Sequence, residues 1–222
     1  MIKISLPNYN ERLELESPFS LLISIENKKS LVKIMMDLNS ERIEEVIGFY
    51  DLERAEFWEK EKVRFIESAL FVDPNDKKNL TMLRKQLKKC YTSQLNDSAV
   101  KLKSKLEKWF EDIRLDFDID LISDIELKAE DLLKMMNIKI NASGGTLLER
   151  ILCYRKVSME LTGTKVFLFH HLSLFLEKEE LTDLVHESAL LGCSVVDFES
   201  DALFAKVLEK SIVLDSDFTA IL

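Results

Sequence analysis

The fold class follows from residues 163–198, which read GTKVFLFHHLSLFLEKEELTDLVHESALLGCSVVDF. Residues 165–170 form a short apolar run that is typical of a buried strand. Residues 177–191 show the apolar spacing of an amphipathic helix, and Gly192 is placed to end it. A further apolar run over residues 193–198 predicts the next strand. A strand, a helix and a second strand joined by short links predict a parallel βαβ unit.

Strands and helices also alternate through the rest of both ends of the chain. Period-two alternation and short apolar runs predict further strands at residues 2–6, 13–15, 19–25, 63–72, 138–140 and 211–215. Helices are expected from Asn27 to about residue 38, after Thr146, and over residues 200–208. Residues 39–60 fit either a helix or a loop. We therefore expect an α/β head that is built from both ends of the chain.

The middle of the chain has a different pattern, because residues 76–139 contain neither glycine nor proline. Apolar residues recur at helical spacing from Leu80 to Ile113, with a break near residues 96–98. Ser123 is placed to cap a second helix that ends near Met136. The expected domains are a discontinuous α/β head of residues 1–75 and 138–222 and an α-helical leg of residues 76–137.

The composition is that of a globular protein with a sizeable core. Hydrophobic residues make up 46% and charged residues 32% of the 222 residues, which excludes collagen-like and mostly disordered classes. Cys90, Cys153 and Cys193 share no CxxC spacing, so we interpret them as reduced thiols. No apolar run reaches the roughly 18 residues of a membrane span. The N-terminus lacks the apolar core of a signal peptide, and a cytoplasmic protein without membrane contact is expected.

Charge divides the expected leg into two halves. Residues 77–108 carry ten basic and two acidic side chains, a net charge of +8, although the whole chain has a net charge of −9. Residues 111–131 carry nine acidic and two basic side chains, a net charge of −7. The basic half is either a solvated helix face or a track for the phosphates of duplex DNA. The lysines proposed for the track, chosen by helical spacing, are Lys85, Lys88, Lys89, Lys101, Lys105 and Lys108, with Lys28, Lys29 and Lys33 of the head in reserve.

The acidic half contains a possible cation-binding pattern. The spacing of Asp116, Asp118 and Asp120 resembles that of the oxygen ligands in calcium loops. The segment lacks the glycine and the closing glutamate of an EF-hand, which excludes that motif. Two interpretations stay open: an acidic helix entrance that the helix dipole favours, and a site for a hard cation such as Ca²⁺ or Mg²⁺.

The sequence contains none of the common catalytic motifs. Residues 70–79 lie where a phosphate loop could lie, but they lack the GxxxxGK[ST] pattern. The loop at residues 143–146 precedes a helix without the lysine that a phosphate loop needs. His170 and His171 end a buried strand with no Cys, Ser or Asp pattern around them, so we interpret them as strand-end residues. Two alternatives to DNA binding remain: a degenerate nucleotide hydrolase that uses residues 73–78, and a protein-interaction scaffold.

Several segments from Asp118 to the C-terminus follow one another in a recognisable order. They are Asp118-Ile119-Asp120-Leu121, Asp131-Leu132-Leu133-Lys134, Ile138-Lys139-Ile140, the helix after Thr146, Lys165-Val166-Phe167-Leu168-Phe169, Leu176-Glu177-Lys178-Glu179-Glu180-Leu181 and Ser211-Ile212-Val213-Leu214-Asp215-Ser216-Asp217. Together with the length and the N-terminal strands, these segments resemble the ring-forming spacer-acquisition proteins of type II-A CRISPR–Cas systems. The specificity of the resemblance lies in the whole pattern.

The resemblance implies a P-loop-ATPase-like head with degenerate nucleotide motifs and an inserted helical leg. It further implies a homotetrameric ring that admits double-stranded DNA by its ends and is supported by Ca²⁺. Such a protein would have no enzymatic activity, and its partners in spacer acquisition would be the CRISPR integrase proteins and the RNA-guided effector nuclease. Asp118 and Asp120 match the family's acidic hinge region, and two further acids lie close to it. The metal ligands that the resemblance implies are Asp118, Asp120, Asp124 and Glu126.

Overall fold

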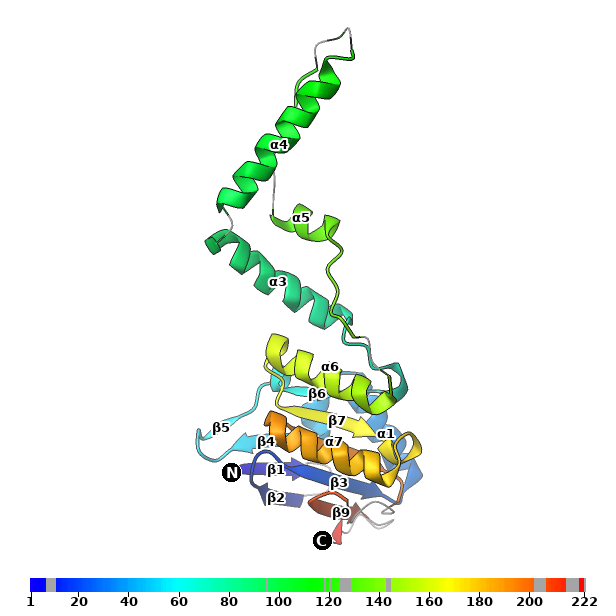
Figure 1. Cartoon of the computed structure of the whole chain (residues 1–222). Helices are drawn as coiled ribbons and strands as arrows, with labels where there is room; N and C mark the ends of the chain where they lie inside the picture. The colour runs from blue at the N-terminus through cyan, green and yellow to red at the C-terminus, as the bar shows by residue number, and fades with distance from the viewer. Residues whose placement is uncertain are drawn as a thin grey trace. The chain divides into compact units, whose positions relative to one another are not determined.

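The chain folds into two compact units, which are drawn in Figure 1. One unit comprises Met1–Pro74 and Ala142–Leu222 and is mixed α/β, and the other comprises Asn75–Asn141 and is helical. The mixed α/β class expected from the sequence is therefore confirmed. The computed structural model describes residues 1–6, 11–94, 96–117, 119, 121–123, 129–142, 145–201, 207–214 and 220–221. Within these residues, no helix has the length and apolar character to span a membrane.

The α/β unit is built around a six-stranded sheet of order β10-β9-β3-β8-β7-β6. Its strands are β3 (Ser20–Ile25), β6 (Val63–Phe65), β7 (Val166–His170), β8 (Ser194–Glu199), β9 (Lys210–Leu214) and β10 (Ala220–Ile221). All are parallel except β10, which pairs antiparallel with β9. Strands β7 and β8 are parallel neighbours joined through α7 (Lys178–Leu191), which confirms the predicted βαβ unit.

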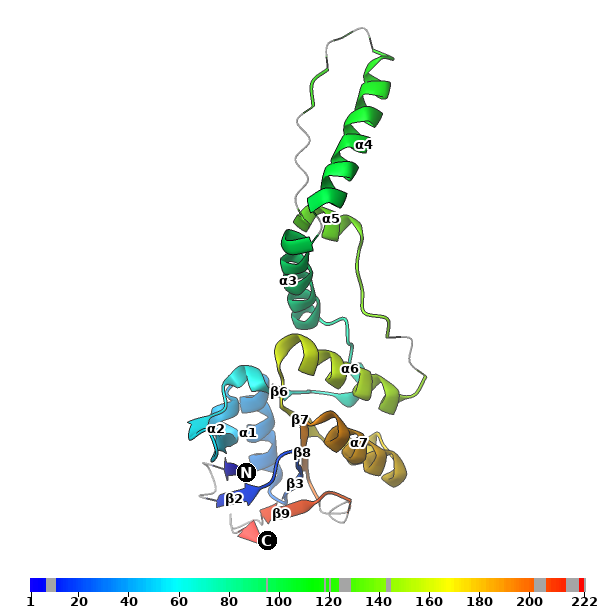
Figure 2. The same ribbon diagram turned by 60° about the vertical axis from the view of Figure 1, so that its left-hand side comes forward.

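Apolar side chains cover both faces of this sheet, and for that reason β3 and β8 are buried along their whole length. Helix α1 (Lys28–Asn39) lies on one face, and α6 (Leu147–Thr162) and α7 lie on the other (Figure 2). Neighbouring residues of β3 divide between the two sides. Leu21 packs in the cluster that contains Ile34 of α1, whereas Leu22 belongs to the cluster beneath α6 and α7.

Local sequence signals set the ends of these helices. Asn27 caps α1, because its side-chain oxygen accepts hydrogen bonds from the backbone N–H groups two and three residues further on. Helix α6 begins with a capping box in which the Thr146 and Glu149 side chains each accept a hydrogen bond from the other residue's backbone N–H. Gly163 and Gly192 end α6 and α7 with φ angles of 70° and 75°, a conformation that glycine adopts without a steric cost.

The capping box gives a first prediction. Replacing Thr146 with alanine removes the acceptor for the Glu149 N–H, and we expect the free energy of unfolding to fall by about 1 kcal/mol. Urea unfolding followed by circular dichroism measures the change. The matched control is Thr146→Ser, which keeps the hydroxyl and should unfold at a urea concentration close to the wild-type midpoint. An equal loss in both variants would contradict the capping role.

A second, antiparallel sheet of order β2-β1-β4-β5 packs against the same face of the large sheet as α1. Its strands are β1 (Ile2–Leu6), β2 (Glu11–Leu15), β4 (Gly48–Asp51) and β5 (Glu56–Phe57), and the short helix α2 (Ile43–Val46) precedes β4. Ile2, Ile4 and Leu6 point into the core, and the residues between them face outward. The structure thus resolves the undecided residues 39–60 into α2 and the β4–β5 hairpin.

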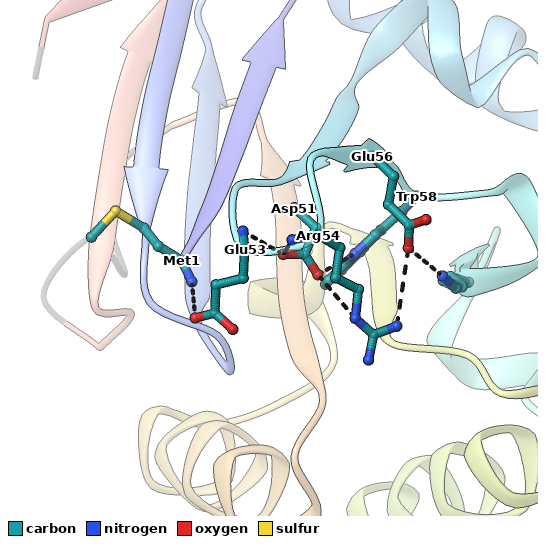
Figure 3. Close-up of polar contacts among 7 residues, drawn as sticks. Met1, Asp51, Glu53, Arg54, Glu56 and Trp58 are labelled. Carbon is teal, nitrogen blue, oxygen red and sulfur yellow. Dashed lines mark hydrogen bonds and ion pairs between the residues drawn. The ribbon is translucent and has the colours of Figure 1, made fainter.

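Polar contacts of Asp51 build the turn between β4 and β5 (Figure 3). One carboxylate oxygen accepts hydrogen bonds from the backbone N–H groups of Glu53 and Arg54, at 3.0 and 3.2 Å. The other accepts a bond from the indole N–H of Trp58 at 3.5 Å. Desolvation raises the pKa of Asp51, but these hydrogen bonds lower it more, so the net pKa lies below the ordinary value. The ionised carboxylate therefore stabilises the turn between β4 and β5 through these hydrogen bonds.

Two strands expected from the sequence differ in the structure. Residues 63–72 form only the short strand β6 and then the 3₁₀ turn η3 (Ala69–Phe71), in which only Ala69 is buried, so the apolar run did not distinguish a strand from a turn. Residues 138–140 form no strand, and that prediction was wrong. Ile140 instead bonds to the side chain of Asn75, which accepts from its N–H at 2.7 Å and donates to its carbonyl at 3.0 Å. Two further 3₁₀ turns are η2 (Lys60–Lys62) and η4 (Leu172–Leu174).

The helical unit consists of α3 (Lys77–Gln94), α4 (Asn96–Arg114) and α5 (Ala129–Met135). Helix α3 ends at Gln94 and α4 begins at Asn96, close to the break that the sequence indicated near residues 96–98. Helix α5 contacts α3, while α4 extends away from both in the two views (Figures 1 and 2). The bonds between Asn75 and Ile140 join the segment that enters the unit to the segment that leaves it. The unit is thus a single insertion that closes on itself.

Candidate functional site

Helix α3 separates basic from apolar side chains. Lys85, Lys88 and Lys89 are exposed, whereas Leu83 and Leu87 are partly buried. At 100° per residue the lysines share one side of the helix and the leucines lie on the opposite side. The helix therefore buries its apolar stripe and presents a continuous basic face to solvent.

Helix α4 carries the second set of proposed DNA-binding lysines. Lys101, Lys105 and Lys108 are exposed and follow i, i+4 and i, i+3 spacing, so they form one stripe along the helix. An apolar stripe runs beside them, in which Leu102 is 39% and Trp109 is 63% exposed. No described element covers this apolar stripe. Helix α4 therefore offers solvent both a row of positive charge and an apolar row next to it.

The proposed metal ligands cannot be placed on this surface. Asp118, Asp120, Asp124 and Glu126 all lie outside the described residues. Before them, the exposed Asp116 follows α4, and Arg114 pairs with Glu111 at 3.1 Å. Among the side chains that the structure does describe, no group of three or more His, Cys, Asp or Glu residues could hold a metal ion.

The lysines held in reserve lie at the start of α1. Lys28, Lys29 and Lys33 are exposed there, and α1 follows the central strand β3 directly. A strand–loop–helix junction of this kind holds the phosphate loop in P-loop proteins. Here the junction is only Glu26 and Asn27, and the Asn27 side chain already accepts the N–H groups that an anion would need.

The segment of residues 70–79, which the sequence analysis considered as a phosphate loop, does not lie at the β3–α1 junction. It follows the edge strand β6, continues through η3 and begins α3. The Asp76 carboxylate accepts a hydrogen bond from the Asn79 N–H at 2.8 Å. A negative charge occupies this helix start, which disfavours a phosphate at the same N–H groups.

A buried polar cluster lies at the carboxyl ends of β7 and β8, where open parallel sheets commonly hold their ligands. Asp197 and Glu199 are 1% and 3% exposed. Glu199 accepts hydrogen bonds from the Ser173 N–H at 3.0 Å and forms a 2.8 Å bond with Nδ1 of His171. Asp197 shares a hydrogen bond with Glu199, and two carboxyl groups can share one only when a proton lies between them.

Electrostatics favours a proton on Asp197. Burial is the largest cause that raises the pKa of Asp197 well above 3.8, and the charge and hydrogen bond of Glu199 raise it further. His170 lies beside His171, with ring centroids 4.5 Å apart, and burial and the neighbouring histidine lower its pKa. Its Nδ1 atom has no hydrogen-bond partner among the described residues. His170 is therefore a neutral strand-end residue.

The sequence interpretation singled out both histidines but neither buried acid. The signal for the acids was present, because Asp197 and Glu199 alternate with apolar residues in the buried strand Ser194–Glu199. An acid in a buried strand needs a hydrogen-bond partner, and the backbone N–H groups of Leu172 and Ser173 in the turn after β7 are such partners. The cluster joins the carboxyl ends of β7 and β8 through the turn that follows β7. Its arrangement is that of a structural network.

Comparison with known proteins gives the family. The model for the CRISPR-associated protein family Cas_Csn2 matches residues 42–218, most of the chain. The chain belongs to the Cas_Csn2 family. This membership confirms the resemblance to the spacer-acquisition proteins of type II-A CRISPR–Cas systems, and it supports a role in CRISPR adaptation for this Cas_Csn2 member.

A solved structure shares the fold of this Cas_Csn2 member. It is the crystal structure of Stu0660 of Streptococcus thermophilus, with a TM-score of 0.52 and 15% sequence identity. The match covers 96% of this chain and 74% of that one. At this identity the likeness concerns the fold alone. No curated protein matches the chain.

Proposed function

We propose that this protein is a non-enzymatic protein that binds double-stranded DNA without sequence preference and acts in CRISPR spacer acquisition as a homotetrameric ring. The observation that carries the proposal is the pair of exposed basic faces on α3 and α4, in a family of CRISPR-associated proteins. Lysine stripes bind the phosphate backbone, which is the same for every sequence. Aromatic residues are sparse among these lysines in the sequence, which does not favour stacking of unpaired bases.

Self-association is supported by the apolar row of α4. Leu102 and Trp109 are exposed beside the lysine stripe, and a second copy of the chain would bury them. The segment after α4 is strongly acidic and the lysine segments are strongly basic, so copies also attract one another by charge. A ring would collect the basic faces of several acidic subunits in one place. The duplex would then enter by an end and pass through the ring.

Calcium ions belong to the same proposal. The expected ligands Asp118, Asp120, Asp124 and Glu126 offer carboxylate oxygens, which Ca²⁺ prefers over nitrogen and sulfur. A bound cation would also reduce the repulsion within a segment of net charge −7. The ion would support the assembly and would supply no chemical step.

The α/β unit fits a P-loop-ATPase-like head whose nucleotide motifs have degenerated. Numbered in chain order, its parallel strands lie in the order 5-1-4-3-2, with the first strand leading directly into a helix. That junction has no glycine, and Asn27 occupies its N–H groups. These features support a head that no longer hydrolyses nucleotides. The proposed partners are the CRISPR integrase proteins and the RNA-guided effector nuclease, as the family resemblance implies.

Salt dependence of binding tests the proposal. We expect the logarithm of the affinity for linear duplex DNA to fall linearly with the logarithm of salt concentration, with a slope of about −0.9 per neutralised phosphate. Duplexes of unrelated sequence should give the same slope and affinity. Fluorescence anisotropy between about 50 and 200 mM salt measures both. A flat response to salt would remove the proposal.

Light scattering coupled to size-exclusion chromatography tests the ring. We expect a tetramer that retains linear duplex in preference to closed-circular duplex, and a chelator should loosen both the tetramer and the DNA complex. A monomer that treats both forms of DNA alike would contradict a threaded ring and favour the scaffold alternative.

A further inference from the structure

The outer face of the antiparallel sheet carries a small set of side chains that nothing in the proposed function uses. Strand pairing places them in two rows on one face. Lys3 lies between Glu14 and Tyr50, and Tyr50 is paired with Phe57. In the next row Ser5 lies between Arg12 and Gly48. Because paired residues of neighbouring strands share a face, all these side chains point away from the core.

The small residues in the second row leave a hollow. Lys3, Ser5, Arg12, Tyr50 and Phe57 line a cavity of 280 Å³. Gly48 has no side chain to fill the hollow, and a Cβ added there would lie 2.7 Å from the Ser5 hydroxyl. This volume is just below the roughly 300–1,000 Å³ typical of small-molecule pockets, which suits one planar ring better than a larger ligand.

The walls of the hollow are aromatic on one side and cationic on the other. The rings of Tyr50 and Phe57 meet edge to face, with centroids 4.9 Å apart and 70° between their planes. Phe57 is 69% exposed, an unusual position for a phenylalanine that no binding partner covers. Lys3 lies 4.0 Å from Glu14, a distance that leaves the ammonium group weakly paired, and Arg12 is exposed.

The hairpin that carries Phe57 is fixed by its own turn. Asp51 binds the backbone of that turn and the indole of Trp58, the residue next to Phe57 (Figure 3). Trp58 stacks on Phe49 in the core, with ring centroids 5.9 Å apart. The neighbour of Phe57 is therefore held from both sides. An exposed ring on a fixed strand is a preorganised stacking platform, since little freedom is lost when a ligand binds.

We propose that this hollow binds an unpaired nucleotide of a single DNA or RNA strand, with the base on the Phe57 and Tyr50 rings and the phosphate between Lys3 and Arg12. Stacking on sheet aromatics beside basic side chains is a general chemistry of single-strand recognition. The proposed site lies in the α/β unit, and three of its residues precede residues 42–218 that the family model matches. It does not rest on duplex binding by the helical unit.

The test uses the full chain and a short fluorescein-labelled oligothymidylate, followed by fluorescence anisotropy. We expect Phe57→Ala to weaken binding about 5- to 100-fold, since stacking of one base contributes that much. Phe57→Trp should keep the affinity. Arg12→Glu should weaken binding and reduce its salt dependence. The matched control is Phe71→Ala, which removes another highly exposed phenylalanine of the chain, 84% exposed, and should leave binding unchanged.

Several outcomes would overturn the proposal. Wild-type affinity in Phe57→Ala would do so, and so would the absence of oligothymidylate binding to the wild-type chain. Competition by free thymidine monophosphate as strong as by the oligonucleotide would assign the hollow to mononucleotides instead of strands. A change in oligomeric state on replacing Phe57 would make the face a protein interface.

A further variant distinguishes this site from the proposed duplex track. If the charges of the track lysines on α3 and α4 are reversed and oligothymidylate binding is retained, the two sites are independent.

Discussion

Reversing the charge of three lysines on α4 should abolish most duplex binding. In the variant Lys101→Glu, Lys105→Glu and Lys108→Glu, we expect affinity for linear duplex DNA to fall at least about 100-fold, with a salt slope smaller by about one unit for each lost phosphate contact. The three exposed side chains form one stripe, so the reversal turns an attractive row into a repulsive one. Fluorescence anisotropy over a range of salt concentrations measures both quantities.

The matched control separates this local effect from net charge. Lys156, Lys178 and Lys210 are exposed residues of the α/β unit, and replacing all three with glutamate changes the net charge by the same amount. That variant should keep most of its duplex affinity. Similar losses in both variants would show that overall charge, not the α4 stripe, controls binding. Circular dichroism should show unchanged helix content, since each glutamate replaces a residue of similar helix propensity.

Replacing Asp197 with asparagine should change how stability depends on pH. Because burial raises the pKa of Asp197, the folded chain keeps a proton there at pH values at which the unfolded chain has lost it. The stability of the wild-type protein should therefore decrease as pH rises from about 4 through the raised pKa. Asparagine donates the same hydrogen bond to Glu199 and cannot ionise, so the variant lacks this loss.

The two proteins should differ most in alkaline solution. At about pH 9 we expect Asp197→Asn to be more stable than the wild type by at least about 1 kcal/mol, because burying a second carboxylate charge beside Glu199 is costly. Urea unfolding at a series of pH values measures the difference. Asp183→Asn, on the exposed side of α7, serves as the control and should follow the wild-type curve. Parallel curves for the Asp197 variant and the wild type would contradict the shared proton.

Local signals in the sequence predicted the parts of the fold that depend on neighbouring residues. Asn27, Gly163 and Gly192 end or begin helices as expected, and the run over residues 163–198 forms the strand–helix–strand unit. Parts that depend on distant residues were missed. The pairing of Ile140 with the Asn75 side chain replaced an expected strand, since a three-residue apolar segment has no ladder of its own to join.

The candidate sites also divide into those that neighbouring residues predict and those that depend on residues distant in the sequence. Helical spacing alone placed Lys101, Lys105 and Lys108 in one exposed stripe. The partners of the buried pair Asp197 and Glu199, by contrast, were identified only from the structure, in which β7 and β8 are neighbours and the turn after β7 contacts both acids. The hollow on the outer sheet face required the register of four strands, because its lining residues are scattered between positions 3 and 57.

The hydrogen bonds between Asn75 and Ile140 have a consequence for how such chains can diverge. They bring the two ends of a long insertion together, so the helices between them can lengthen, shorten or be exchanged without moving the points where the backbone leaves and re-enters the sheet-bearing part. Within the part of the chain that the structure describes, every strand pair lies outside that insertion. Relatives could therefore keep both sheets and vary the length of the basic helices.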